Sequence, residues 1–266
     1  MIHQLNMQGK DKVQVAINRL RTFEPPEGYY LAFSGGKDSV VIKALADMAG
    51  VKYDAHYTVT SVDPPELVQF IKTFDDVSFD RPLDKDGNQI TMWNLIPKRK
   101  MPPTRIVRYC CQALKETRGG NRFVVTGVRW AESAKRKQSR GGLEIANGSK
   151  MRDHADPDNP DNETLARFCP TKGHHILNPI IDWENDDVWE FIHEYNVPYC
   201  ELYDQGYKRL GCIGCPMSYN QAEELEKYPK YKAAYLRTFQ RMYESFDEDK
   251  CKWKSGQDIY DWWISK

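Results

Sequence analysis

Short apolar runs alternate with amphipathic stretches along the first 195 residues. Turn residues follow the apolar runs, which therefore predict buried strands at 29–33, 53–59, 122–126 and 176–181. Apolar positions at helical spacing predict helices at 11–22, 40–48, 66–74, 111–117, 132–137 and 186–195. This alternation favours an α/β fold, in which a parallel twisted sheet carries helices on both faces.

The remaining segments divide the chain. Residues 75–105 show mixed character, with a turn at 84–88 and a basic, proline-bearing loop at 97–103. Residues 139–163 are rich in Gly, Asn, Asp and Pro and predict a surface excursion with one hairpin. The end of the chain predicts helices at 221–227, 230–246 and 259–264. We therefore expect an α/β domain at 1–220 and a helical extension at 221–266.

Composition narrows the class of protein. The 40% hydrophobic and 29% charged residues are typical of a globular protein, and no apolar run approaches the ~20 residues of a membrane helix. The first residues have no signal-peptide core, so the expected location is cytoplasmic. Net charge is zero, but the only acids between Lys98 and Arg140 are Glu116 and Glu132. This 98–140 stretch is either a solvated mixed surface or a basic face for nucleic acid.

The strongest motif is Ser34-Gly35-Gly36-Lys37-Asp38-Ser39, which lies between a predicted strand and a predicted helix. Two glycines permit a tight turn and a close approach to a ligand, and the N–H groups of a first helical turn attract anions. The two serine hydroxyls and the lysine complete a small oxyanion cradle. The string is not a Walker A motif, and an ordinary Gly-Gly turn is the alternative.

The cysteines form two pairs that are distant in sequence. Cys110 and Cys111 are adjacent, and Cys212 and Cys215 form a CxxC motif. A CxxC alone fits half a zinc site, half a cluster site or a redox dithiol. Four soft ligands together suit zinc or a [4Fe–4S] cluster.

The Ser-Gly-Gly-Lys-Asp-Ser string resembles the signature of the PP-loop superfamily, the adenine nucleotide α-hydrolases. Further strings resemble the phosphoadenosine-phosphosulfate (PAPS) reductase branch: Gly127-Val128-Arg129-Trp130-Ala131-Glu132-Ser133, Asn178-Pro179-Ile180-Ile181-Asp182-Trp183, and Gly211-Cys212 through Cys215-Pro216. The motifs occur in order over residues 28–220.

This resemblance implies that the loop binds the phosphates of ATP, or of APS or PAPS, with Mg²⁺. The implied nucleotide-binding residues are Ser34, Gly35, Gly36, Lys37, Asp38, Ser39, Gly127, Arg129 and Glu132. Of these, Lys37, Asp38 and Arg129 are the candidate catalytic residues. Arg129 would clamp a phosphate, and Glu132 would orient Arg129 or bind Mg²⁺; the alternative is a surface Arg–Glu pair.

Assimilatory APS reductases carry a Cys-Cys pair and a distant CxxC that hold a [4Fe–4S] cluster. The resemblance therefore assigns a [4Fe–4S] cluster to Cys110, Cys111, Cys212 and Cys215, with structural zinc as the alternative. Cys169 could replace Cys110, whereas Cys200 and Cys251 are expected to be inert. We expect structural roles for His174, His175 and the tryptophans at 253–263.

Two features bear on the reaction. The reductases share a C-terminal Glu-Cys-Gly-Leu-His motif with a nucleophilic thiolate, and this sequence lacks it. Its intact loop resembles that of ATP-cleaving members, including the DNA phosphorothioation sulfurtransferase. We therefore expect adenylating, pyrophosphate-releasing sulfur transfer to a nucleic-acid or small acceptor. The alternatives are an APS or PAPS reductase that releases sulfite and a non-catalytic nucleotide or cluster sensor. A sulfur-donor protein and a homodimer are the further partners considered.

Overall fold

The computed structural model describes residues 11–116, 119–146, 152–159, 162, 175–246 and 251–265. The chain forms two compact units. Unit 1 comprises Met1–Tyr57, Gln69–Ser78 and Gly119–Lys208, and unit 2 comprises Thr58–Val68, Phe79–Arg118 and Arg209–Lys266. No described helix is long and apolar enough to cross a membrane. The predicted division at residue 220 stays a prediction.

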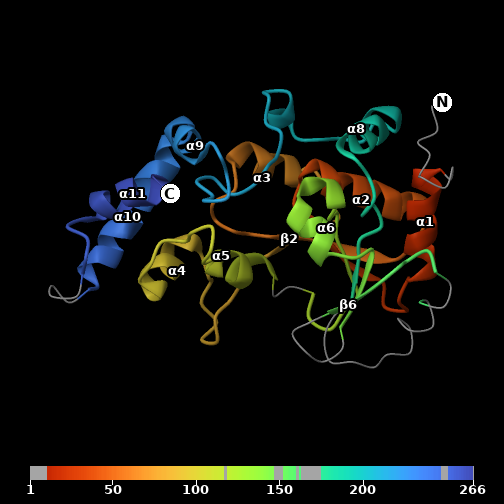
Figure 1. Cartoon of the computed structure of the whole chain (residues 1–266), viewed down its shortest axis with the longest axis horizontal. Coiled ribbons are helices and arrows are strands. Elements are labelled where there is room, and N and C mark those ends of the chain that lie inside the picture. Colours follow the sequence, from red (N-terminus) through yellow and green to blue (C-terminus); the bar gives the residue numbers. More distant parts are fainter. Residues whose placement is uncertain are drawn as a thin grey trace. The chain divides into compact units, whose positions relative to one another are not determined.

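The described strands form a seven-stranded sheet in the order β3-β2-β1-β4-β7-β5-β6. β1 pairs in parallel with β2 and β4, and β4 pairs in parallel with β7, so this part has the expected parallel arrangement. The strands are β1 (Tyr29–Ala32), β2 (Tyr53–Thr58), β3 (Val77–Asp80), β4 (Val124–Val125), β5 (Leu143–Ala146), β6 (Arg152–Ala155) and β7 (Ile176–Leu177). The expected α/β fold is confirmed (Figure 1).

The sheet also has an antiparallel part. β5 runs antiparallel to both β7 and β6. The β5–β6 pair is the hairpin predicted within 139–163, and its return strand reverses direction because a hairpin must.

The helices of unit 1 agree closely with the sequence pattern. Asp11 caps the first helix by accepting a hydrogen bond from the Val13 N–H at 2.8 Å, and Gly50 ends the second with φ of 68°. The helices and turns here are α1 (Lys12–Thr22), α2 (Lys37–Ala49), a 3₁₀ turn (Trp130–Glu132), α6 (Ala134–Ser139), α8 (Asn185–Glu194) and a 3₁₀ turn (Glu201–Tyr203). α1 packs on α2, and α2 packs on α8 (Figure 1).

Helices build unit 2, with α10 packed against α4, α9 and α11. They are α4 (Met92–Arg99), α5 (Tyr109–Cys111), a π-helical segment (Gln112–Glu116), α9 (Gln221–Lys227), α10 (Pro229–Glu244) and α11 (Gly256–Ile264), while α3 (Pro65–Ile71) begins in unit 2 and ends in unit 1. Trp263 is 1% exposed and packs with Tyr235 and Phe239. The C-terminal tryptophans therefore contribute to a core, as predicted.

Residues 75–105 are more regular than their sequence indicates. They contain β3 and α4, and Pro97 lies inside α4 rather than in a loop. Proline cannot donate to the carbonyl four residues earlier, that of Trp93. The Arg241 guanidinium donates to this carbonyl instead, at 2.6 Å. A side chain from α10 thus compensates for the helix breaker, which local sequence could not reveal.

Candidate functional site

The Ser-Gly-Gly loop joins the carboxyl end of β1 to the start of α2. Gly35 has a φ of 72°, a left-handed conformation that glycine adopts without strain. Gly36 supplies no side-chain cap to α2. The loop therefore brings its backbone close to the helix N-terminus, where a phosphate would meet N–H groups and the positive end of the helix dipole.

Hydrogen bonds from Ser39 hold this loop closed. The Ser39 hydroxyl donates to the Gly36 carbonyl at 2.8 Å and accepts from the Ser34 N–H at 3.2 Å. The two hydroxyl oxygens lie 3.3 Å apart. Ser39 is only 4% exposed, so these contacts form in a largely desolvated position. These hydrogen bonds fix the conformation of the loop.

Arg129 reaches the loop from a distant part of the sequence. Its Nε donates to Asp38 Oδ1 at 2.7 Å, and its Nη1 donates to the Trp183 carbonyl at 3.2 Å. Arg129 is 2% exposed. Lys37 Nζ contacts the other Asp38 oxygen at 3.3 Å. The three candidate catalytic residues therefore form one chain of charges, in which Asp38 lies between two cations.

The sheet order explains this convergence. β1, β4 and β7 are parallel neighbours, so the loops that follow them leave the same edge of the sheet. These loops carry the motifs that begin at Ser34, Gly127 and Asn178. The Thr126 hydroxyl and the Asn178 side chain hydrogen-bond to each other, which joins the second and third loops.

Gly127 allows the closest approach. A Cβ at this position would lie 2.9 Å from the Asp38 carbonyl oxygen and 3.0 Å from the Asp38 carbonyl carbon. Both atoms belong to backbone and cannot rotate away. Gly127 therefore lets the loop after β4 pack directly on α2.

Glu132 contacts Arg129 through its backbone. The Glu132 carboxylate accepts the Arg129 N–H at 3.3 Å and pairs with the Arg136 guanidinium. Arg129 is thus not half of a surface Arg–Glu pair, because its side chain points to Asp38. Glu132 orients the turn that presents Arg129.

Tyr203 is a residue of the site that sequence reasoning missed. Its hydroxyl accepts the Lys37 N–H, the first of α2, at 2.9 Å. The ring packs edge-on against Trp189, with centroids 5.1 Å apart. Nothing local to Tyr203 predicts a contact across 166 residues.

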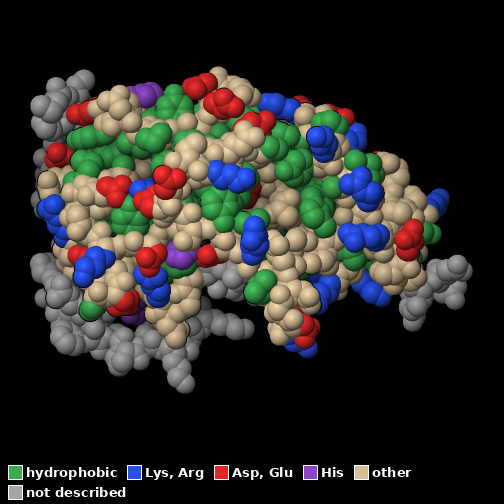
Figure 2. Space-filling model, turned by 180° about the vertical axis from the view of Figure 1, so that it is seen from behind, with side chains coloured by type: hydrophobic (Ala, Val, Ile, Leu, Met, Phe, Trp, Pro, Cys, Tyr) green, Lys and Arg blue, Asp and Glu red, His purple; other side chains and the backbone are tan. Residues whose placement is uncertain are grey.

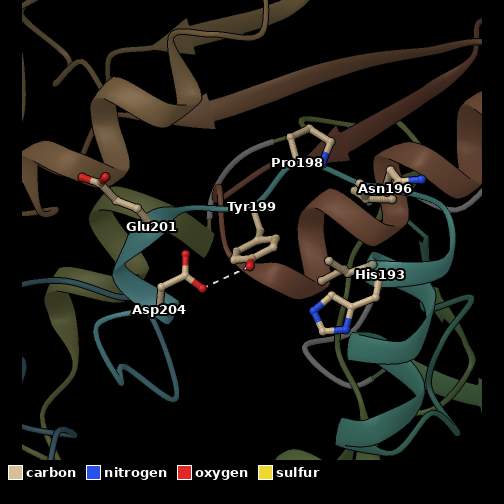
Figure 3. Close-up of a pocket in the computed structure, with 8 residues that line it drawn as sticks. His193, Asn196, Pro198, Tyr199, Glu201 and Asp204 are labelled. Atoms are coloured by element: carbon tan, nitrogen blue, oxygen red, sulfur yellow. Dashed lines mark hydrogen bonds between the residues drawn. The ribbon is translucent and has the colours of Figure 1, made fainter.

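A pocket of about 410 Å³ lies beside this turn, at the end of α8. Figure 3 shows the Tyr199 hydroxyl directed at Asp204, with His193 on the other side of the ring. The Tyr199 hydroxyl donates to Asp204 at 3.0 Å. The pocket lining is Ile192, His193, Asn196, Val197, Pro198, Tyr199, Glu201 and Asp204.

Unit 2 contains both cysteine pairs. Cys110 and Cys111 end α5, and Cys212 and Cys215 lie in the turns before α9. A hydrogen bond to Cys111, followed by burial, raises the pKa of Cys110. The hydrogen bond with Cys110 lowers the pKa of Cys111 to about 5. The Arg108 guanidinium also lowers this pKa, whereas burial opposes both effects. These opposite shifts favour a thiolate at Cys111 over one at Cys110.

Cations surround these thiols. Arg108 Nη2 lies 3.4 Å from Cys111 Sγ. Burial raises the pKa of Cys212 to about 12, and the thiolate form of Cys212 would raise the pKa of Lys115, which lies near it. Cys110, Cys212 and Cys215 all act electrostatically on the buried Tyr235 hydroxyl. The four predicted ligands therefore share one electrostatic neighbourhood.

The thiols are not gathered into a formed metal site. Within the described ranges, no group of three or more His, Cys, Asp or Glu side chains is placed to hold a metal ion. Cys169 and His174 lie outside the described residues. Cys200 is fully buried, and the His175 ring packs edge-on against Phe123, as structural roles require.

The basic 98–140 stretch separates into two parts. In unit 1 its arginines pair with carboxylates: Arg122 with Asp54, Arg129 with Asp38, Arg136 with Glu132 and Arg140 with Glu144. In unit 2, by contrast, Arg99 and Arg105 lie over the rings of Tyr109 and Tyr219. The unit 2 part is therefore the better candidate for an anionic partner.

A mostly parallel α/β sheet with this loop at its carboxyl edge defines the class, and sequence comparison defines the family. The model of the phosphoadenosine phosphosulfate reductase domain matches residues 28–218. The chain belongs to this family, as the resemblance implied.

Individual relatives are more distant. A protein of Methanocaldococcus jannaschii is 27% identical over 227 residues, which cover 82% of this chain and 49% of the relative. Adenosine 5'-phosphosulfate reductase of Neisseria meningitidis serogroup B is 29% identical over 118 residues, or 44% of this chain and 40% of the enzyme. The chain thus spans about half the length of the curated relatives it matches. Among solved structures, the PAPS reductase of Candida auris has a TM-score of 0.48 at 17% identity, covering 79% of this chain and 96% of that one.

Proposed function

We propose that the chain binds ATP with its phosphates on the loop 34–39 and cleaves it between the α- and β-phosphates. The observation that carries this proposal is the Lys37–Asp38–Arg129 chain of charges beside a preorganised loop. The loop offers backbone N–H groups and hydroxyls, and Lys37 adds a positive charge. These groups suit a polyphosphate.

Arg129 has a positioning role in this proposal. Because its guanidinium is buried against Asp38, it fixes the carboxylate that in turn contacts Lys37. Mg²⁺ would be bound by the nucleotide phosphates with carboxylate oxygens nearby, as hard oxygen ligands favour. An acceptor oxygen attacks the α-phosphorus, the acceptor is adenylated and pyrophosphate leaves.

We assign a [4Fe–4S] cluster to the four cysteines of unit 2. The donor set fits, because four thiols share one neighbourhood with two cations, and such a cluster with four thiolates is anionic. Thiolates are required for ligation, and Arg108 already stabilises one of them at Cys111. When bound, the cluster would supply a site for sulfur delivery.

The acceptor in this proposal is a nucleic acid or a small molecule. The cations of unit 2 between Lys98 and Arg108 suit a polyanion. A sulfur-donor protein supplies the sulfur, and a homodimer would double the site.

Labelled ATP tests the proposed reaction. Protein prepared anaerobically, with ATP labelled at the α-phosphate and Mg²⁺, is expected to release pyrophosphate and to retain label on AMP or on an acceptor. Lys37→Met should abolish turnover, whereas Lys72→Met, at an exposed lysine outside the loop, should not change it. ADP as the product would contradict cleavage at the α-phosphate, and tight ATP binding without any product would indicate a sensor.

The second candidate is reduction of APS or PAPS with release of sulfite. The family match and the named APS reductase relatives favour it. The reaction requires a thiolate that attacks sulfur. The half-buried Cys251, between α10 and α11, belongs to neither cysteine pair and is the candidate for this thiolate. Thiol-dependent sulfite release that is lost in Cys251→Ser would establish this candidate.

A further inference from the structure

Four of the most exposed apolar side chains gather on two loops of unit 2. Ile106 is 92% exposed and Val107 40%, on the loop that leads into Cys110 and Cys111. Met217 is 51% exposed and Tyr219 95%, on the loop that follows Cys215. Each loop therefore flanks one of the two cysteine pairs.

Arg105 joins these two loops. Its Nε donates to the Pro216 carbonyl at 2.9 Å, and its guanidinium carbon lies 5.7 Å from the centre of the Tyr219 ring. The two loops thus form one surface, which we call the Arg105–Tyr219 surface. It comprises Arg105, Ile106, Val107, Met217 and Tyr219.

Local hydrogen bonds hold the exposed side chains in place. The Thr104 N–H donates to the Val107 carbonyl at 3.2 Å, and the Val107 N–H donates to the Thr104 hydroxyl at 3.0 Å. The Ser218 N–H donates to the Cys215 carbonyl at 2.8 Å. These hydrogen bonds close a turn in each loop, and the turns present Ile106 and Tyr219 to solvent.

The stretch of sequence that leads through this surface is basic. Residues 98–108 include five Lys or Arg and no acid. Arg108 is the last cation of this stretch, and its guanidinium contacts Cys111 Sγ. Figure 2 shows one face of the molecule, on which exposed green side chains lie among blue Lys and Arg side chains on the right.

We propose that the Arg105–Tyr219 surface binds single-stranded nucleic acid, with an unstacked base on the Tyr219 ring. An aromatic platform with a neighbouring arginine is the arrangement by which proteins stack bases without reading their sequence. Ile106 is placed to insert between bases as an apolar wedge, and the basic loop meets the phosphates. The base would be held next to the cysteine pairs.

This inference rests on the proposed function, because it names the class of molecule that would accept the sulfur. The binding itself can be measured without catalysis. A duplex hides its base faces in the stack, so the surface should distinguish a single strand from a duplex of the same sequence. A protein partner would use the apolar side chains, but it would not account for the run of cations without acids.

Fluorescence anisotropy with a labelled 20-nucleotide single strand, DNA and RNA in turn, tests the proposal on the full chain. We expect Tyr219→Ala to weaken binding roughly 10-fold, because stacking on one ring is lost. Tyr219→Phe keeps the ring and should bind like the wild type. Tyr195→Ala, at a 43% exposed tyrosine in unit 1, is the matched control. Affinity should also fall steeply with salt.

Equal binding by the wild type and Tyr219→Ala would overturn the proposal, as would equal affinity for the duplex. Absence of oligonucleotide binding by the wild type would also overturn it and would favour a protein partner for this surface. Pyrophosphate release from ATP by the same proteins separates the two claims. Strand binding without pyrophosphate release would refute the proposed function alone, and the reverse would refute this surface alone.

Discussion

Arg129 Nε lies 2.7 Å from Asp38 Oδ1, although 91 residues separate them in the sequence. Asp38 follows the glycines of the loop, and Arg129 follows β4. The pair therefore connects two of the three motifs at the carboxyl edge of the sheet. Since Arg129 is 2% exposed, this ion pair forms where it is little screened by solvent.

Removal of Arg129 should therefore affect both stability and ligand binding. Arg129→Ala leaves Asp38 without its buried cation, and because Asp38 is partly exposed we expect a loss of about 2 kcal/mol in the free energy of unfolding. ATP binding should weaken at least as much as in Lys37→Met. Urea denaturation and calorimetric titration measure the two effects. Unchanged stability and affinity would show that the pair is incidental.

Gly127→Ala should disturb the loop through sterics alone. The added Cβ would meet the Asp38 backbone at 2.9 Å, so either β4 or α2 must shift. We expect a destabilisation of roughly 1–3 kcal/mol, as for overpacking in a core, together with weaker ATP binding. Gly211→Ala is the matched control, because a Cβ there has no atom within 4 Å. Equal melting temperatures for the two variants would contradict this packing.

Tyr203→Phe should strengthen phosphate binding. The Tyr203 hydroxyl accepts the Lys37 N–H, so it would compete with a phosphate for this donor. Loss of one hydrogen bond of about 1 kcal/mol predicts roughly 5-fold tighter binding of pyrophosphate. Tyr199→Phe removes a hydroxyl that is bonded to Asp204 instead and should have no effect. Weaker binding in Tyr203→Phe would mean that this hydroxyl donates to the ligand.

Alkylation of the reduced, metal-free chain should select Cys111. Its pKa is lowered to about 5, so its thiolate is present above pH 5 and is lost as the pH falls through that value. Burial raises the pKa of Cys212 to about 12, which keeps that thiol protonated at neutral pH.

Labelling with iodoacetamide at pH 6, followed by mass spectrometry, measures how fast each cysteine is alkylated. Arg108→Gln should slow Cys111 labelling several-fold by raising its pKa, whereas Arg105→Gln should not. Faster labelling of Cys212 than of Cys111 in the wild type would refute the assignment of charge.

Local sequence was sufficient for the phosphate loop. A strand, two glycines and a helix are consecutive in the chain, so the positions of Ser34 and Ser39 follow from β1 and α2 alone. The β5–β6 hairpin and the Gly50 helix end were predictable for the same reason. The family motifs predicted which distant residues belong to the site.

Contacts between distant segments could not be predicted locally. The role of Glu132 depends on where the Arg129 side chain points, and this follows from the order β1-β4-β7 in the sheet. Tyr203 and the Arg241 contact that accommodates Pro97 also require the folded chain. The sequence named the four cysteines as ligands of one centre, which stays a prediction, and it did not predict Lys115 and Arg108 beside them.

The most direct test is to offer the anaerobically purified chain ATP, APS and PAPS in parallel after iron, sulfide and zinc have been quantified. Our account predicts about four irons per chain, lost when any of the four paired cysteines is replaced by serine, and pyrophosphate released from ATP alone. Sulfite from APS or PAPS, with ATP left intact, would contradict it and identify a reductase.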